Sequence, residues 1–247
     1  MSTIYESEKI LAEYLLFHFG TEQEILTPDR SWPAGMREAL DFPIRTAAHF
    51  SRHLVQRGLD LGCAVGRSAF EMSRHCEEVI GIDFSHAFIH AAEALRNGDV
   101  LKYARREEAA LTSPLVARLP AGIDPARLAF QQGDAMALPD DLGQFDRVHA
   151  ANLLCRLPAP NRLLTRLPGL VKAGGELVLA TPCTWLSEFT PPENWPAAGT
   201  FDWLKSTLAP DFSLVLLTDE PFLIRETARK FQWTTSQVSV WRRNEKE

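Results

Sequence analysis

The segment LDLGCAVGRSAFEMS, residues 59–73, constrains the fold of this chain more than any other stretch. A short apolar run, typical of a buried strand, leads to Asp60, and Gly62 and Gly66 follow it. A helical pattern of apolar residues begins directly behind Gly66. Because glycine lets a backbone turn tightly and approach a ligand, the segment predicts a strand, a ligand-binding turn and a helix.

The alternation of strands and helices continues along the chain. Strands are predicted at 57–62, 78–83, 126–134, 144–152 and 174–182, with helices at 67–76, at 85–98 and near 160–172. Such alternation predicts βαβ units and a parallel sheet. Residues 212–243 break the pattern and are predicted to form two antiparallel strands. We therefore expect an α/β, Rossmann-like sheet of seven mostly parallel strands, with helices on both faces and an antiparallel C-terminal hairpin.

The N-terminal quarter of the chain has a different pattern. Residues 7–19 predict an amphipathic helix that starts after Ser7 and stops at Gly20, and a second helical pattern covers 41–55. We expect 1–55 to form a helical cap on a core of 56–247, both within one domain. Residues 99–125 form a long connection, in which YARREEAAL is predicted to be helical and the rest irregular.

Composition limits the classes of function. The formal net charge of −6 argues against nucleic acid as the main partner. The four cysteines include no C-x-x-C pair and no zinc-ligand spacing, so we expect free thiols in a cytoplasmic protein and no metal. No signal peptide is recognisable, and no apolar run approaches the ~18 residues of a membrane span.

The spacing of the glycine turn narrows the choice of ligand. The pattern is D-x-G-x-x-x-G, so the G-x-G-x-x-G fingerprint of nicotinamide-linked oxidoreductases is absent. The carboxylate of Asp60 would repel a phosphate but attract a cation. The turn resembles motif I of the class I S-adenosylmethionine (SAM)-dependent methyltransferases, in which it holds the methionine part of SAM. Ala64 departs from the glycine that this family commonly has there.

Later motifs extend the resemblance in the order of that family. It implies that Asp83, 21 residues after Gly62, accepts the ribose hydroxyls, that Phe84 stacks on the adenine, and that Asp134 faces the adenine amino group. The end of the fourth strand would border the transferred methyl, and LVKAGGELVLATP resembles the passage into strand five. The implied cofactor site comprises Asp60, Gly62, Cys63, Gly66, Asp83, Phe84, Asp134, Ala135 and Asn152. Helix capping by Asp60 or Asp83 and a turn role for Asn152 are the structural alternatives.

Segments outside these motifs resemble a narrower family. YESEKILAEYLLFHFG, ATPCTWLSEFTPPENW and FLIRETARKFQWTTSQVSVWRR resemble the methyltransferase module of ovothiol biosynthesis. That resemblance implies methylation of an imidazole nitrogen of 5-thiohistidine (4-mercaptohistidine), and a partnership with a sulfoxide synthase, to which the module is often fused. A methyltransferase for another small molecule and a SAM-binding protein without catalysis are the alternatives.

Candidate residues for such an acceptor come from the same segments. Tyr14 and His18 share a helical face, so Tyr14, His18 and Asn152 are the predicted catalytic residues, with His18 as a base. A carboxylate of the acceptor would require a cation, and an ammonium group would require an anion. The predicted acceptor site therefore comprises Tyr5, Tyr14, His18, Arg67, Trp185, Phe189, Arg225 and Glu226. For each of these, a place in the core or on a solvated face is the structural alternative.

Overall fold

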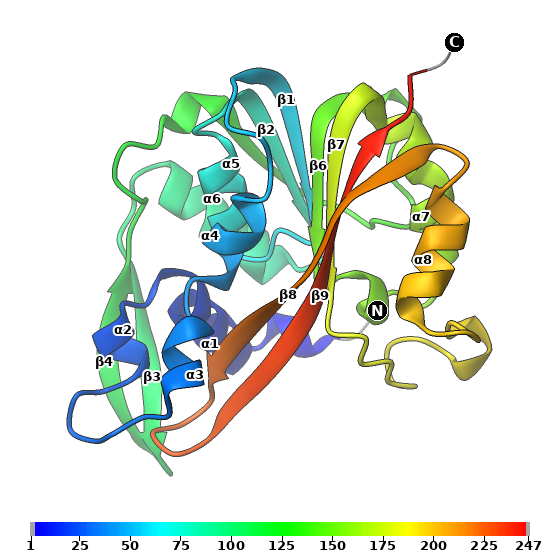
Figure 1. Ribbon diagram of the computed structural model, residues 1–247. Coiled ribbons are helices and arrows are strands. Elements are labelled where there is room, and N and C mark those ends of the chain that lie inside the picture. Colours follow the sequence, from blue (N-terminus) through cyan, green and yellow to red (C-terminus); the bar gives the residue numbers. More distant parts are fainter. Residues whose placement is uncertain (1–2, 246–247) are drawn as a thin grey trace.

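A seven-stranded sheet forms the centre of the molecule (Figure 1), which is a computed structural model that describes residues 3–245. The strands lie in the order β5-β2-β1-β6-β7-β9-β8. Their bounds are β1 Val55–Leu61, β2 Cys76–Asp83, β5 Leu128–Gln132, β6 Phe145–Ala151, β7 Val171–Thr181, β8 Phe212–Arg225 and β9 Phe231–Arg243. The first five strands in this order are parallel, and β9 runs antiparallel to β7 and β8. The predicted fold class and C-terminal hairpin are thus confirmed.

Helices cover both faces of this sheet. One face carries α5 Arg67–Met72 and α6 His86–Arg96, and the other carries α7 Pro160–Leu170 and α8 Thr200–Leu208. Two apolar cores result, one around Phe70 and Leu95 and the other around Leu163 and Trp241. The central strands are buried on both sides, which explains why they read as continuous apolar runs in the sequence. Short 3₁₀ turns lie at Pro125–Arg127, Asp140–Leu142, Leu154–Arg156 and Pro192–Asn194.

The N-terminal residues form a group of short helices, called the cap below, which ends before β1 begins at Val55. It contains the 3₁₀ turn η1 Thr3–Glu6 and the helices α1 Glu8–Phe19, α2 Glu22–Ile25, α3 Ala34–Glu38 and α4 Phe42–Ala47. The oxygen of Ser7 caps α1 by accepting a hydrogen bond from the backbone of Ile10. The helix expected over 41–55 is shorter than predicted and ends at Ala47. Ser51 lies beyond it, where its hydroxyl donates to Glu176 at 2.7 Å.

The long connection after α6 contains a β-hairpin, so the helix predicted there is wrong. Strands β3 Leu101–Glu108 and β4 Leu111–Ala117 pair antiparallel as a separate two-stranded sheet. Ala, Arg and Glu favour a helix locally, but Tyr103 is buried and alternating side chains of β3 face the cap. Arg105 on this strand donates to the carbonyl of Glu24 at 2.6 Å.

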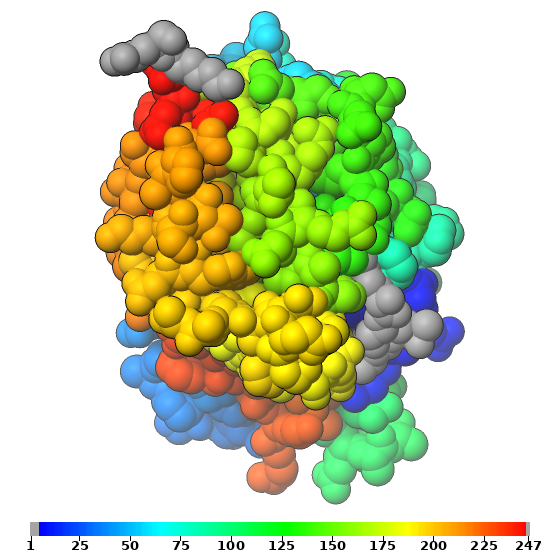
Figure 2. Space-filling model, turned by 90° about the vertical axis from the view of Figure 1, so that its right-hand side faces the viewer, coloured from blue at the N-terminus to red at the C-terminus, as the bar shows by residue number. Residues whose placement is uncertain are grey.

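The far ends of the two hairpins meet the cap below the sheet. Only residues 237–242 of β9 pair with β7, whereas its first residues pair with β8 alone. Figure 2 shows the segment between β7 and α8 (yellow) above the tips of the β8–β9 hairpin (orange-red) and the β3–β4 hairpin (green). Within the described residues, no helix has the length and apolar character that crossing a membrane requires.

Candidate functional site

A cavity of about 530 Å³ lies between the cap and the carboxyl ends of β1, β2 and β6. Ligands of open α/β sheets bind at this edge. Its wall combines α1, the glycine turn, the ends of β2 and β6, the segment after β7, and the overhanging part of β8–β9. Of the residues predicted from the sequence, the wall includes Tyr5, Tyr14, His18, Gly62, Asp83, Phe84, Ala135, Asn152 and Phe189.

The turn between β1 and α5 has left-handed backbone conformations and reaches the cavity wall at Gly62 and Ala64. Gly62 has φ +70°, and a Cβ there would lie 3.1 Å from Leu153 Cδ1. Ala64 has φ 47°, the left-handed region in which an L side chain costs about 1–2 kcal/mol, and this explains why glycine suits the position. Gly66 and the buried Cys63 are absent from the cavity wall. A Cβ on Gly66 would meet the Phe130 ring at 2.8 Å, so this glycine permits close packing of helix on sheet.

Asp83 ends β2 with its carboxylate fixed at the cavity. One oxygen accepts a hydrogen bond from the backbone of Ala64 and the other from the backbone of Ser85, both at 2.9 Å. Burial raises the pKa of Asp83 from 3.8 to about 6, despite these two donors. Because each carboxylate oxygen accepts more than one hydrogen bond, the group can still receive two hydroxyls. Phe84 beside it is 42% exposed, which leaves its ring available for stacking.

Two acidic residues of the predicted cofactor site do not reach the cavity wall. Asp60 is 1% exposed, and its carboxylate lies 2.7 Å from Nδ1 of the buried His149. Asp134 accepts a hydrogen bond from the backbone of Met136 at 2.8 Å, which closes a turn. The structure therefore gives both carboxylates intramolecular partners, while Ala135 presents the segment after β5 to the cavity.

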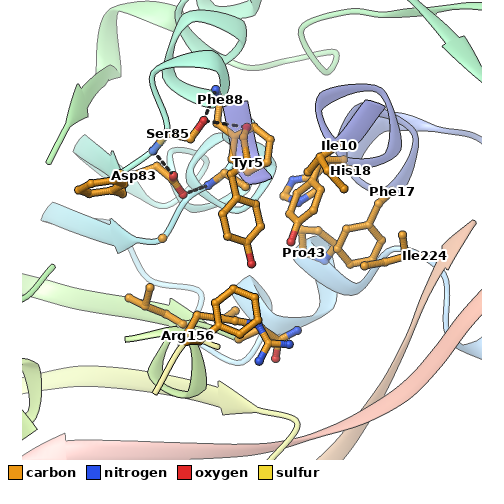
Figure 3. Close-up of a pocket in the computed structure, with 18 of the residues that line it drawn as sticks. Tyr5, Ile10, Phe17, His18, Pro43, Asp83, Ser85, Phe88, Arg156 and Ile224 are labelled. Carbon is orange, nitrogen blue, oxygen red and sulfur yellow. Dashed lines mark hydrogen bonds between the residues drawn. The ribbon is translucent and has the colours of Figure 1, made fainter. Parts of the chain in front are cut away.

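The cap contributes a cluster of aromatic side chains. The Tyr14 ring lies 4.7 Å from that of Phe88 and is stacked 5.8 Å from that of His18. Figure 3 shows Tyr5 reaching from this side into the space between Asp83 and Arg156. Burial, with Arg67 nearby, lowers the pKa of His18 to about 3, so its ring is neutral at physiological pH. A group with this pKa is a poor proton acceptor at pH 7, and the role of base predicted for His18 does not fit the structure.

Asn152 follows β6 and lies on the cavity wall, as predicted. Its φ of 54° places it in the left-handed region, so it is also a turn residue. Its backbone donates to the carbonyl of Ala180 at 2.8 Å, and its side-chain oxygen accepts from Ser236 at 2.6 Å. The turn thus ties three strands together at the point where it borders the cavity.

Both arginines predicted to bind a carboxylate are engaged elsewhere. Arg67 lies 3.2 Å from the carboxylate of Glu71 on the next helical turn. Arg225 has a side chain that is 1% exposed, contacts Glu107 at 2.6 Å and donates to the carbonyl of Ile25 at 2.8 Å. Neither is on the cavity wall. Arg225 of the motif LIRETAR therefore forms a partly buried tertiary ion pair, because the β3–β4 hairpin brings Glu107 against it.

Two further acceptor predictions also fail to reach the cavity. Glu226 forms an ion pair with Lys230 at 2.7 Å in the connection between β8 and β9. Trp185 donates its indole hydrogen to Thr200 at 2.8 Å and packs against Trp203. Phe189, four residues further along the chain, is the aromatic residue of this segment that reaches the cavity wall.

Sequence reasoning missed four charged residues of the cavity wall, which are Glu6, Glu13, Arg156 and Glu188. Arg156 lies four residues after Asn152, within the motif FDRVHAANLLCRL, and this proximity was the available signal. Burial raises the pKa of Glu13, whose Oε1 has no hydrogen-bond partner among the described residues and lies 3.6 Å from Lys9. Nothing in the sequence separates Glu13 from the other acidic residues around α1. No cluster of three His, Cys, Asp or Glu side chains in the described chain is arranged to hold a metal.

Residues 59–179 match the family described as methyltransferase domain. Ubiquinone biosynthesis O-methyltransferases of Coxiella burnetii are 24% identical over 154 residues, which is 60% of this chain and 55% of theirs. This chain thus matches only about half the length of these curated relatives.

Solved structures resemble nearly the whole chain. The N-methyltransferase NodS from Bradyrhizobium japonicum, in complex with S-adenosylhomocysteine (SAH), aligns with a TM-score of 0.54 and 14% identity over 95% of this chain and 99% of its own. The [4+2]-cyclase SpnF aligns with a TM-score of 0.62 and 16% identity over 99% and 96% of the two chains. At these identities the similarity shows the fold alone.

The family match contains the cofactor side of the cavity. It begins in β1, includes the glycine turn, Asp83 and Asn152, and ends in β7. The glycine turn at the cavity wall and the fixed acceptor oxygens of Asp83 fit the methionine and ribose parts of SAM. Residues 59–179, which match the methyltransferase domain family, thus contain the half of the cavity that fits SAM.

Proposed function

We propose that the protein is a SAM-dependent N-methyltransferase that methylates an imidazole nitrogen of 5-thiohistidine, in ovothiol biosynthesis. One observation carries the proposal: the segments that resemble the ovothiol module border the same cavity as the cofactor turn. The first segment contributes Tyr5, Tyr14 and His18, the segment after β7 contributes Phe189, and the C-terminal hairpin contributes Gln232. Such convergence is expected if these segments build one acceptor site.

The cofactor half of the cavity would hold SAM through few groups. Asp83 would accept the ribose hydroxyls, the turn at Gly62 would give the methionine part room, and Phe84 with Ala135 would enclose the adenine. When bound, SAM supplies an electrophilic methyl on a sulfonium. The remaining task of the chain is to align the acceptor and to exclude water from it.

The acceptor half fits an aromatic heterocycle. Tyr5, Tyr14 and Phe189 offer ring faces, and the buried Nδ1 of His18 has no hydrogen-bond partner among the described residues. A neutral His18 can donate to or accept from an imidazole nitrogen and so orient the ring. The nitrogen lone pair then forms the bond to the methyl carbon, and the sulfonium sulfur takes the electrons of the bond that breaks. The surplus ring proton goes to solvent, so no strong base is required.

The direct test incubates the protein with SAM and 5-thiohistidine and follows both products by mass spectrometry. We expect one added methyl on the acceptor and an equal amount of SAH. Histidine should react much more slowly because it lacks the sulfur and has a less acidic ring. Equal rates with histidine, or no reaction with 5-thiohistidine although SAM binds, would contradict the proposed acceptor. The domain assignment would stand in either case.

The proposal also implies where the acceptor comes from. Thiol-bearing histidine is a product of sulfoxide-synthase chemistry, so we propose a functional partnership with such an enzyme in the cytoplasm. Adding that enzyme with its own substrates should replace added 5-thiohistidine in the same assay. The other candidate acceptors are the small-molecule O- and N-nucleophiles that methyltransferases of this fold use, and the same assay on a panel of phenols and amines tests them.

A further inference from the structure

Arg156 differs from the other arginines near the cavity. Among residues 3–245, it is the single lysine or arginine on the cavity wall. Arg67 and Arg225 are each neutralised by a glutamate, at 3.2 and 2.6 Å. Arg156 has no carboxylate partner within the described chain, and the groups that hold it are uncharged. The cavity wall also carries the carboxylates of Glu6, Glu13, Asp83 and Glu188, but none of them forms an ion pair with this guanidinium.

Contacts with two neighbouring segments hold the Arg156 side chain in place. This residue ends the 3₁₀ turn Leu154–Arg156 after β6. Its Nη1 donates to the carbonyls of Cys155 and Thr184, both at 3.2 Å. The guanidinium lies 4.7 Å from the centre of the Phe189 ring. These contacts come from the segments after β6 and after β7, so the guanidinium is held between them.

The neighbours of this guanidinium also indicate what it would bind. Figure 3 shows Arg156 on the opposite side of the cavity from Asp83, with Tyr5 between them. An arginine that stacks on an aromatic ring is weakly hydrated, and its planar donors suit a carboxylate. The contacts to Thr184 and Phe189 place it with the segment after β7, on the acceptor half of the cavity.

We propose that Arg156 binds the carboxylate of the acceptor, so that the enzyme acts on an amino acid and discriminates against the corresponding amine. This inference rests on the proposed function, which supplies an acceptor with a carboxylate. Arg156 takes the role that the sequence assigned to Arg225. Phe189 limits the guanidinium to one plane and thereby sets the direction of the carboxylate relative to the methyl donor.

The test compares 5-thiohistidine with its decarboxylated counterpart, the thiol-bearing histamine. Affinities are measured by calorimetry on the SAH-saturated protein, and KM and kcat by the methylation assay. The variants are Arg156→Gln and Arg156→Lys, with the exposed Arg162→Gln on α7 as a matched control. We expect wild type to prefer the amino acid about tenfold to hundredfold, the range for a charge-assisted hydrogen-bonded pair. Arg156→Gln should abolish the preference through KM, Arg156→Lys should restore part of it, and Arg162→Gln should retain it.

Other outcomes separate this inference from the proposed function. If 5-thiohistidine is methylated and Arg156→Gln keeps the full preference for the amino acid, Arg156 does not bind the carboxylate, whereas the proposed methyltransferase function stands. If Arg156→Gln weakens SAH binding by the same factor and leaves the preference intact, Arg156 holds the carboxylate of the cofactor instead, which also overturns the inference. If 5-thiohistidine is not methylated, the calorimetry is repeated with imidazole-4-propionate and its amide. Tighter binding of the acid that is lost in Arg156→Gln supports carboxylate binding by Arg156, and equal binding of acid and amide refutes it.

Discussion

Replacing Asp83 by asparagine should stabilise the protein and weaken its cofactor binding at the same time. In the folded protein the pKa of Asp83 is about 6, against 3.8 ordinarily. At neutral pH, keeping this carboxylate ionised therefore costs about 3 kcal/mol of folding free energy, as an order of magnitude. Asparagine removes that cost but leaves one backbone N–H, of Ala64 or Ser85, facing an amide hydrogen, which costs about 1–2 kcal/mol. We expect a net stabilisation of about 1–2 kcal/mol near pH 7.

The stability difference between wild type and Asp83→Asn should also depend on pH. A carboxyl whose folded pKa is raised contributes most to stability below its unfolded pKa, and loses that contribution as the pH rises through the folded pKa. Wild type should therefore gain about 1 kcal/mol of stability relative to Asp83→Asn when the pH falls from about 7 to about 5, which removes most of the expected difference. Urea denaturation without cofactor at both pH values measures this difference in the free energy of unfolding. The exposed Asp99→Asn is the control.

Cofactor affinity should change in the opposite direction. Losing charge-assisted hydrogen bonds to the ribose hydroxyls costs about 1.5–3 kcal/mol, which is about tenfold to hundredfold in Kd. Calorimetry with SAH measures this loss, and wild type should itself bind SAH more weakly below about pH 6, where Asp83 takes up a proton. An Asp83→Asn protein that is less stable than wild type and binds SAH normally would refute the reasoning, because Asp83 would then be a structural residue.

Three further substitutions test individual parts of the site. Gly62→Val should weaken SAH binding at least about hundredfold in calorimetry, because the side chain adds a clash with Leu153 to the cost of a positive φ. Gly98→Val, at φ +89° in open space, controls for backbone strain. An equal effect of both substitutions on SAH binding would contradict a role of Gly62 in binding the cofactor. Arg225→Met should lower the free energy of unfolding by about 2 kcal/mol in urea, because it breaks the partly buried ion pair with Glu107 and the buried hydrogen bond to Ile25, and should leave the acceptor KM unchanged. His18→Gln should leave the pH profile of kcat/KM between pH 6 and 8 as in wild type, since a His18 pKa of about 3 keeps the ring neutral there. If the variant instead lost a titration step of that profile, His18 would be the base after all.

The glycine turn and the strand ends could be predicted because their chemistry is local. A left-handed residue at 62 and an acid at the end of the second strand depend on a few neighbouring residues, and the parallel sheet then brings these strand ends to one edge. The antiparallel pair at 212–243 was predictable for the same reason, since two apolar runs flank one polar connection. The helix predicted within 99–125 failed because helix propensity is weaker than burial of alternate side chains in a hairpin.

The sequence alone therefore determined the fold class, the cofactor turn, and the contributions of Asp83 and Asn152 to the cavity. Which charges face the acceptor was decided only by tertiary structure. Arg225 and Arg156 look equally available in the sequence, but the β3–β4 hairpin places Glu107 against the first, whereas uncharged groups hold the second at the cavity. Ion pairs form between residues far apart in the chain, here 118 positions, so no local pattern reveals which arginine remains uncompensated.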